Sequence, residues 1–269
     1  NLSSNDIALL QYTGGTTGGI KAAILSHRNI LANAIQVREW LGKQLRFGED
    51  IAICALPLYH IFALTCNSIV FFYFGANNIL ITNPRDIRGF VKELKKYQFT
   101  FISGVNTLFN KLLEEPKFSS CDFSKLNISI AGGMPVQKSV GDRWQKVTGC
   151  LLVVGYGLSE TAPAASIDPI NGKAFSDTIG LPLPSTEMSI QNKKGEILSA
   201  GEVGEICIRG PQVMRGYWKK ESETKKVLTQ DGWFRTGDVG IMQENGFFKI
   251  VDRIKDMIII SGFNVFPSE

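Results

Sequence analysis

The chain has 269 residues, of which 44% are hydrophobic and 20% are charged, and its formal net charge is +4. This length suffices for one large domain or two small ones with a sizeable core, and the composition excludes wholesale disorder. The 29 basic and 25 acidic side chains are interspersed, whereas nucleic-acid binding usually needs a basic stripe. We therefore expect a globular protein that binds no nucleic acid.

Cysteine usage bears on the redox environment. The five cysteines are odd in number, and no two of them form a Cys-x-x-Cys pair. This pattern argues against both a disulfide framework and a zinc site. We expect reduced, buried thiols and a cytoplasmic setting.

The first two-thirds of the chain alternate short apolar runs with amphipathic segments. Strands are predicted over residues 7–12, 51–55, 78–81, 99–103, 128–131 and 151–156. Helices are predicted over residues 27–45, 61–74, 87–97, 107–114 and 135–147, with Ser26 as an N-cap and Pro135 in a first helical turn. The alternation predicts a layered α/β fold with a largely parallel sheet.

Residues 51–84 contain no Asp, Glu, Lys or Arg, and this stretch is longer than the roughly 20 residues that a spanning helix requires. Pro57, His60, Asn67 and Gly75 interrupt it, so the apolar runs are short. We interpret it as strand, loop, buried helix and strand, and the helix as either plain core or the wall of an apolar ligand cavity. A membrane-embedded segment is the alternative.

The pattern of predicted elements changes at about residue 176. Short β-type runs over residues 187–191, 203–209, 240–242 and 247–251 are separated by turn pairs such as Asp-Gly and Asn-Gly. We therefore expect an α/β portion over residues 1–175 and a small antiparallel, barrel-like β subdomain over residues 176–252.

A glycine-rich loop follows the first predicted strand. Residues 13–21 read Thr-Gly-Gly-Thr-Thr-Gly-Gly-Ile-Lys. Glycine lets backbone N–H groups turn toward an anion, threonine adds hydroxyl donors, and Lys21 adds a positive charge. The spacing differs from the Walker pattern. We predict a phosphate-binding loop, and a plain flexible turn is the alternative.

A second motif, Gly-Tyr-Gly-Leu-Ser-Glu-Thr over residues 155–161, follows the strand at 151–156. Open α/β sheets bind ligands at the carboxyl ends of their strands. Tyr156 could stack on a base, and Glu160 could hold Mg²⁺, which prefers one or two carboxylates with phosphate oxygens. The alternative is a capped turn that enters a helix, with Glu160 near the helix dipole.

Three further features are weaker when taken singly. Asp238, in Arg-Thr-Gly-Asp, could accept ribose hydroxyls from a tight turn, but a plain Asx turn is the simpler interpretation. The charged run 252–256 is typical of a solvated connector. His60 lies among apolar residues, where a histidine usually has a packing role, and the chain shows no Ser-His-Asp set.

Six blocks, taken in order, resemble the adenylate-forming (AMP-binding) superfamily: YTGGTTGGIK, LPLYHIF, GYGLSET, GEICIRGPQVMRGYW, WFRTGD and VDRIKDMIIISGFNVFPSE. The resemblance covers essentially the whole chain. Segments such as ALPLYHIFALT, NNILITNPRD and GLPLPSTE are most similar to bacterial long-chain fatty-acid CoA ligases. The resemblance implies part of the large domain of the acetyl-CoA synthetase-like or luciferase-like fold.

The resemblance also implies a two-step reaction. A fatty-acid carboxylate attacks the α-phosphate of ATP with Mg²⁺ present, and coenzyme A then displaces AMP to form the thioester. Because two anions must approach each other, backbone donors, lysine and metal have to offset their charge. A fatty-acyl adenylating enzyme that loads a carrier protein, and a non-catalytic nucleotide-binding module, remain as alternatives.

Site residues follow from the resemblance by position. The implied catalytic residues are Glu160, Thr161, His60 and Lys21, and the implied metal ligands are Thr13 and Glu160. The implied nucleotide site comprises Thr13, Gly14, Gly15, Thr16, Thr17, Gly18, Lys21, Gly132, Gly133, Gly155, Tyr156, Ser159, Asp238, Arg253 and Lys255. The implied acyl-substrate residues are His60, Ile61, Val105, Asn106 and Gly133.

Departures from the family pattern concern two residues and the chain ends. Ser159 stands where many relatives have threonine. Ala22 stands where relatives usually have glycine. Relatives carry a section before the phosphate loop and a C-terminal domain after a hinge. By position, Lys255 corresponds to the hinge residue. We therefore expect residues 253–269 to be the hinge and the start of a truncated C-terminal domain, and the fragment alone to be inactive.

The implied partners are a fatty acid, ATP and coenzyme A. Long-chain substrates partition into bilayers, which leaves open peripheral association with the inner membrane of a cytoplasmic protein. A homodimer of the full-length protein is also left open.

Overall fold

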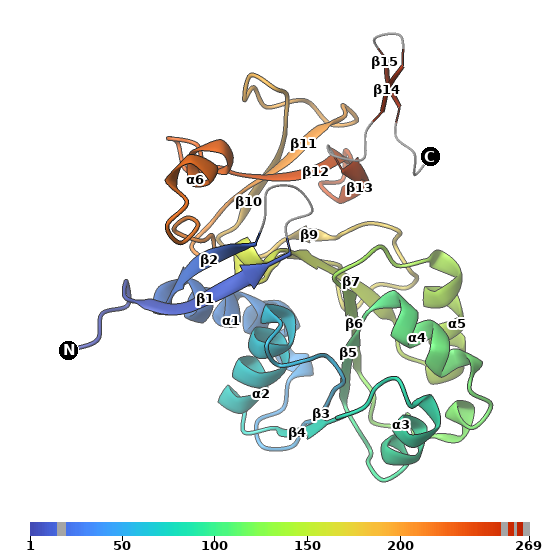
Figure 1. The fold of residues 1–269 in the computed structure, drawn as a ribbon. Helices are drawn as coiled ribbons and strands as arrows, with labels where there is room; N and C mark the ends of the chain where they lie inside the picture. The colour runs from blue at the N-terminus through green and yellow to red at the C-terminus, as the bar shows by residue number, and fades with distance from the viewer. Residues whose placement is uncertain (15–19, 254–257, 261–262, 266–269) are drawn as a thin grey trace.

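The computed structural model describes residues 1–14, 20–253, 258–260 and 263–265. Two sheets organise the chain (Figure 1). A seven-stranded sheet with its helices forms the lower part of that view, and a four-stranded sheet lies above it. The chain crosses from the first sheet to the second after residue 182.

The lower sheet confirms the predicted parallel layer. Its strands are β3 (Ile51–Cys54), β4 (Asn77–Leu80), β5 (Phe101–Gly104), β6 (Ile128–Gly132), β7 (Leu152–Gly157), β8 (Ala164–Ile167) and β9 (Leu181–Pro182). Their order is β4-β3-β5-β6-β7-β8-β9, and the first five are mutually parallel. β8 and β9 add antiparallel pairing at one side.

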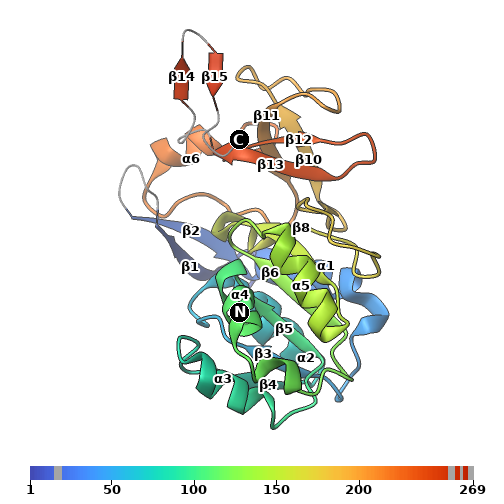
Figure 2. The same cartoon turned by 90° about the vertical axis from the view of Figure 1, so that its right-hand side faces the viewer.

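Helices cover both faces of this sheet, as Figures 1 and 2 show. They are α1 (His27–Leu41), the short 3₁₀ turn η1 (Gly42–Gln44), the π-helical η2 (Ala63–Ile69) with α2 (Val70–Tyr73), α3 (Ile87–Leu94), α4 (Asn106–Glu114) and α5 (Lys138–Thr148). On one face α3, α4 and α5 pack Phe90, Phe109 and Trp144 against Ile53 and Ile102. On the other face α1 and α2 pack against the neighbouring strand residues, such as Ala52 and Phe101.

The uncharged stretch forms β3, a helical segment and β4, in the predicted order, but the helix is only partly buried, because Phe72 and Tyr73 are 84% and 62% exposed. The lack of charged residues in this stretch follows from its place in the fold. β3 is an inner strand of the sheet, β4 is the edge strand beside it, and the helical segment packs against one face of the sheet. Within the described part of the chain, no helix has both the length and the apolar character needed to cross a membrane.

Several helix boundaries differ from the predictions, and α3 ends at Leu94 rather than at residue 97. α1 ends at Leu41 rather than at residue 45, because Gly42 adopts a φ of 51°. α5 begins at Lys138, so the placement of Pro135 in a first helical turn is wrong. Gln137 is the N-cap and donates its N–H to Asn106 Oδ1 at 3.0 Å, which holds the preceding residues out of the helix.

A hairpin of β1 (Ile7–Thr13) and β2 (Lys21–Ser26) carries the glycine-rich loop, and Thr13 pairs with Lys21 at its tip. The prediction missed β2. The extended segment 214–218 pairs along the other edge of β2, where Ile24 donates its N–H to Gly216 O at 2.8 Å and Trp218 donates to Ala22 O at 2.8 Å. The hairpin is thus tied to a segment almost 200 residues away.

The upper sheet is antiparallel, as expected for the β-rich part. It consists of β10 (Glu187–Gln191), β11 (Gly204–Arg209), β12 (Phe234–Met242) and β13 (Phe248–Arg253), in that order. The short 3₁₀ turns η3 (Phe118–Ser120) and η4 (Ser159–Thr161), helix α6 (Glu221–Val227), and a separate hairpin of β14 (Ile258–Ile260) and β15 (Phe263–Val265) complete the described elements.

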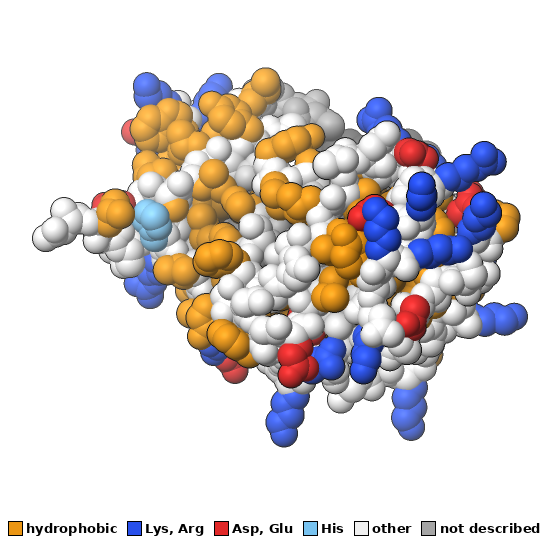
Figure 3. Space-filling model, turned by 90° about the horizontal axis from the view of Figure 1, so that it is seen from below, with side chains coloured by type: hydrophobic (Ala, Val, Ile, Leu, Met, Phe, Trp, Pro, Cys, Tyr) orange, Lys and Arg blue, Asp and Glu red, His pale blue; other side chains and the backbone are white. Residues whose placement is uncertain are grey.

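One face of the molecule gathers apolar side chains where β1, α1 and α2 lie (Figure 3). On α1, Leu31 and Ile35 are more than half exposed, and on α2 Phe72 is 84% exposed. Lysine and arginine dominate the opposite side of the same view.

Candidate nucleotide and acyl site

A cavity of 460 Å³ lies between the carboxyl ends of β6 and β7 and the upper sheet. Residues 133–136 and 154–158 line it from the lower sheet, and Asp238 with residues 249–253 lines it from the upper sheet. The position at the strand ends is where open α/β sheets bind ligands. The predicted nucleotide residues Gly133, Gly155, Tyr156, Asp238 and Arg253 therefore meet in one place.

Asp238 is the charged centre of this cavity and is 4% exposed. Tyr156 donates its hydroxyl to Asp238 Oδ2 at 2.7 Å, and Arg253 Nε lies 3.0 Å from Oδ1. Burial and the neighbouring carboxylate raise the pKa of Tyr156 well above its usual value, so the phenol stays a neutral donor. A buried carboxylate held from two sides presents a fixed acceptor surface to a ligand such as a ribose.

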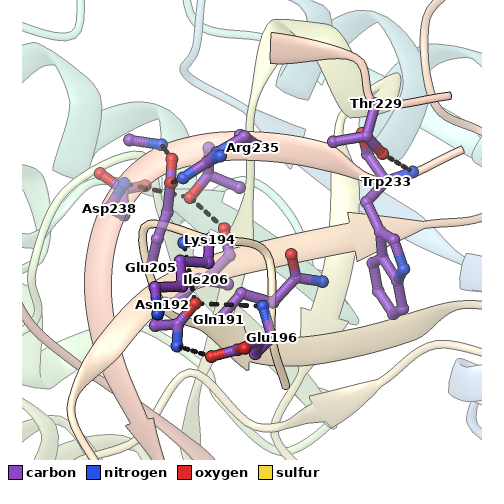
Figure 4. A network of polar contacts seen from close by, with 12 residues as sticks. Gln191, Asn192, Lys194, Glu196, Glu205, Ile206, Thr229, Trp233, Arg235 and Asp238 are labelled. Atoms are coloured by element: carbon purple, nitrogen blue, oxygen red, sulfur yellow. Dashed lines mark hydrogen bonds and ion pairs between the residues drawn. The ribbon is translucent and has the colours of Figure 1, made fainter. Parts of the chain in front are cut away.

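The backbone around Asp238 differs from the predicted tight turn, because residues 235–238 belong to β12. Gly237 has a φ of 77°, which a residue with a side chain rarely adopts. Glu205 of β11 fixes the distortion by accepting from Arg235 Nε at 2.8 Å and from the Gly237 N–H at 2.9 Å (Figure 4). The plain Asx turn is thus not what the structure shows.

Glu160 lies in η4 and is 8% exposed. Tyr217 donates its hydroxyl to Glu160 Oε1 at 2.7 Å, and the Met214 N–H donates to the Glu160 carbonyl at 2.8 Å. The motif enters a single 3₁₀ turn with Glu160 in it, and the chain then continues into β8, so the helix of the alternative is one turn long. η4 also contacts both β1 and β2, which brings Glu160 to the base of the glycine-rich loop.

Lys21 is linked to Glu160 through Tyr217, and its own ion-pair partner is Glu223. The Nζ of Lys21 lies 2.6 Å from Glu223 Oε2 and 5.1 Å from the ring centroid of Tyr217. Thr13 and Gly14 mark the start of the loop, with Thr13 opposite Lys21. The predicted residues Gly15, Thr16, Thr17, Gly18 and Lys255 lie outside the described residues.

The donor set here fits Mg²⁺ carried by a nucleotide. Within the described part of the chain, no three His, Cys, Asp or Glu side chains cluster as a metal cage would require. A single carboxylate, Glu160, matches the preference of Mg²⁺ for few protein ligands plus phosphate oxygens. The Mg²⁺ assignment for Glu160 and Thr13 stays a prediction.

Thr161 and Ser159 occupy different surroundings. Thr161 is fully buried, and its hydroxyl donates to Pro163 O and accepts from the Leu158 N–H at 2.9 Å. Its evident contribution is to the shape of η4. Ser159 is half-buried and lines a second cavity.

This second cavity measures 140 Å³ and is mostly apolar. Val37, Cys66, Ile130 and Ile167 form its inner wall, and residues 155–158 with Gly133 are shared with the first cavity. Gly132 belongs to this wall, where an added Cβ would lie 2.9 Å from Gly155 O. The two cavities therefore adjoin at the strand ends of β6 and β7.

His60 and Ile61 line the second cavity, as predicted for the acyl substrate. His60 is exposed, so the interpretation as a core packing residue is wrong. Desolvation by the apolar wall lowers its pKa and favours the neutral imidazole. Val105 and Asn106 line neither cavity, and Asn106 Oδ1 instead accepts from the Gln137 N–H.

Three residues of this site carry no role in the sequence prediction: Tyr217, Glu223 and Glu205. Tyr217 and Glu205 stand inside a block that resembles the family, and this could have drawn attention to them. Glu223 has no such signal, because only the packing of α6 beside β2 brings it to Lys21.

Known proteins are similar to nearly the whole of this chain. The chain is 53% identical over 266 residues to a long-chain-fatty-acid–CoA ligase of Salmonella typhimurium, covering 99% of this chain and 47% of the relative. A ligase of the same name from Bacillus subtilis is 40% identical, with 98% of this chain and 47% of the relative covered. The chain thus spans about half the length of these relatives.

Solved structures extend the comparison. ATP-bound MatB from Rhodopseudomonas palustris superposes with a TM-score of 0.90 at 30% identity, covering 99% of this chain and 52% of that one. O-succinylbenzoate coenzyme A synthetase (MenE) from Bacillus subtilis, in complex with ATP and magnesium ion, gives 0.86 at 28% identity, covering 99% and 54%. The family model of AMP-binding enzymes matches residues 1–218. The chain therefore belongs to the family of AMP-binding enzymes.

Proposed function

We propose that the full-length protein is a long-chain fatty-acid CoA ligase that forms an acyl-adenylate and then an acyl-CoA thioester. The observation that carries the proposal is a pair of adjoining cavities that share the strand ends of β6 and β7 as lining. Both are lined mainly by apolar surface; the larger one also contains the buried Asp238 with Arg253, and the smaller one is lined by His60. The 53% identity to a ligase of this name supports the choice of substrate.

In the first step the fatty-acid carboxylate attacks the α-phosphate of ATP and pyrophosphate leaves. Asp238 and Arg253 bind the ribose hydroxyls, and Tyr156 with Gly132, Gly133 and Gly155 frames the adenine and the acyl head. The loop from Thr13 to Lys21 binds the β- and γ-phosphates, which reduces the repulsion between the reacting anions. Mg²⁺, held by Glu160 and Thr13, would supply further positive charge at the phosphates.

In the second step the thiol of coenzyme A attacks the acyl carbonyl and AMP leaves. His60 and Ile61 stand beside the acyl head, which is the carboxylate in the first step and the adenylate carbonyl in the second, and Ser159 and Thr161 lie near the α-phosphate. The apolar wall around Cys66 binds the start of the alkyl chain, and each buried methylene adds about 0.8 kcal/mol. Val105, which lies next to Gly133, and Asn106 shape the acyl side.

Three segments divide the work in this proposal. Residues 1–175 bind nucleotide and acyl chain, residues 176–252 close the nucleotide cavity from above, and Lys255 is the hinge of a domain that follows. The pairing of β9 with β8 means that the β-rich part begins only after a last contribution to the lower sheet.

The test is ATP–pyrophosphate exchange by the full-length protein with saturated acids from two to eighteen carbons. We expect exchange to rise with chain length, and coenzyme A to be consumed in the presence of the long acids. Exchange restricted to short or aryl acids would contradict the substrate class. Acyl transfer to a carrier protein but not to coenzyme A would identify a carrier-loading enzyme instead, and absence of exchange would indicate a non-catalytic nucleotide-binding module.

The same preparation tests three finer proposals. The 269-residue chain alone is expected to show no exchange. Peripheral association of a cytoplasmic protein with the inner membrane predicts sedimentation with anionic vesicles. A homodimer predicts twice the monomer mass in analytical ultracentrifugation.

A further inference from the structure

We propose that Glu223 competes with the polyphosphate of ATP for Lys21 and thereby sets the ATP affinity of this protein. The inference rests on the proposed function, in which Lys21 binds the β- and γ-phosphates. Glu223 lies on α6, outside the loop and outside both cavities. It is a positioning residue, because it acts on the nucleotide only through Lys21.

The geometry shows a lysine that is already occupied. Lys21 Nζ lies 2.6 Å from Glu223 Oε2, and the side chains are 15% and 24% exposed. Lys21 also lies over the ring of Tyr217, whose hydroxyl reaches Glu160. A phosphate that takes up Lys21 must therefore break an ion pair which is partly sheltered from water and hence less screened than a surface pair.

Glu223 cannot follow Lys21 into the phosphate site. Thr224, the next residue of α6, accepts the Tyr217 N–H with its hydroxyl at 2.9 Å, and its methyl group lies 2.8 Å from where a Cβ on Gly216 would be. Segment 216–217 is in turn paired with β2. Because α6 is held in place next to Glu223, the Glu223 carboxylate stays where it is. Lys21 therefore has to leave this carboxylate in order to bind the phosphates of ATP.

The exchange leaves no isolated charge behind. Lys226 Nζ lies 2.5 Å from Glu223 Oε1, so Glu223 keeps a cationic partner when Lys21 leaves. The hydrogen bonds from Lys21 and Lys226 lower the pKa of Glu223 to about 2, so it is ionised at neutral pH. An ionised, pre-paired carboxylate can release one lysine while it retains the other.

The test compares ATP with AMP, which lacks the β- and γ-phosphates, by calorimetric titration of the full-length protein. We expect Glu223→Gln to lower the Kd for ATP about three- to ten-fold, the equivalent of a weak, partly exposed ion pair, and to leave the Kd for AMP within about two-fold. The matched control is Glu221→Gln, which removes the same charge from an exposed position of the same helix.

A second variant should change the affinity for ATP in the opposite direction. Lys226→Gln leaves Glu223 with Lys21 alone, so ATP should bind about three-fold more weakly than to the control variant Lys225→Gln, again with AMP unchanged.

The Lys21→Ala variant distinguishes a failure of the proposed phosphate-binding role of Lys21 from a failure of the proposed competition by Glu223. If it fails to weaken ATP binding, or if the unmodified protein binds no ATP, the proposed role of Lys21 fails and the inference fails with it. If Lys21→Ala weakens ATP binding but Glu223→Gln leaves it unchanged or weaker, only the competition by Glu223 is refuted. Equal tightening of ATP and AMP would also refute it.

Discussion

The hydrogen bond between Tyr217 and Glu160 should contribute measurably to stability because both partners are buried. Tyr217→Phe removes only the hydroxyl that donates to Glu160 Oε1 at 2.7 Å. The ring keeps its contacts in the cluster around Ala23 and Leu25, and it remains under Lys21. The variant therefore isolates one donor.

The expected magnitude follows from burial and charge. Tyr217 and Glu160 are 7% and 8% exposed, so water replaces the lost hydroxyl poorly. A hydrogen bond to a charged group is worth about 1.5–3 kcal/mol, and a neutral one about 1 kcal/mol. We expect Tyr217→Phe to lower the free energy of unfolding by about 2 kcal/mol. In a Glu160→Gln background, where the acceptor is neutral, the same change should cost about 1 kcal/mol.

Urea unfolding of the four proteins of this cycle, followed by circular dichroism, measures both values. Tyr59→Phe is the control, because Tyr59 is 84% exposed and a surface change of this kind stays within about 0.5 kcal/mol. Equal losses in the two backgrounds would mean that the charge of Glu160 plays no part. A loss no larger than that of the control would refute the hydrogen bond itself.

Three further predictions concern the cavities and the backbone between them. Cys66→Phe should fill most of the 140 Å³ apolar cavity and lower activity on long-chain acids at least about ten-fold more than on short ones, as a chain-length series of pyrophosphate exchange would reveal. Asp238→Asn removes the charge that faces Arg253 and should weaken ATP and AMP binding alike, by about ten-fold in calorimetry; weakening of ATP alone would contradict the ribose role. Gly157→Ala would place a Cβ 1.9 Å from Pro163 O, so it should destabilise the protein by more than about 2 kcal/mol in thermal unfolding, and an unchanged Tm would show that β7 and β8 approach less closely.

Much of the architecture could be predicted from local pattern. The strands over residues 51–55, 128–131 and 151–156 are short and charge-free, as strands buried on both faces must be. β2 was missed because it begins inside the glycine-rich loop and ends at the N-cap Ser26, so neither end carries a strand signal. The start of α5 was misplaced because Pro135 is equally compatible with a first helical turn and with extended backbone.

Some site residues could be predicted from their motifs, and others could not. Tyr156, Glu160 and Asp238 stand in blocks whose order and spacing mark them, and the structure places Tyr156 and Asp238 in contact although 82 positions separate them. The resemblance implies an acyl role for Val105 and Asn106, but they line neither cavity. His60 was ambiguous, because composition around a residue does not reveal whether its side chain faces the core or a cavity.

The sequence by itself determined the family, the α/β layer and the elements that carry the nucleotide residues, because these depend on local periodicity and on the order of motifs. The tertiary structure alone decided which charges meet. Tyr217 reaches Glu160 across 57 positions and Glu223 reaches Lys21 across 202. Such pairs depend on how α6 and segment 214–218 pack beside β2, and a side chain's partner in space is set by packing of whole elements rather than by its neighbours along the chain.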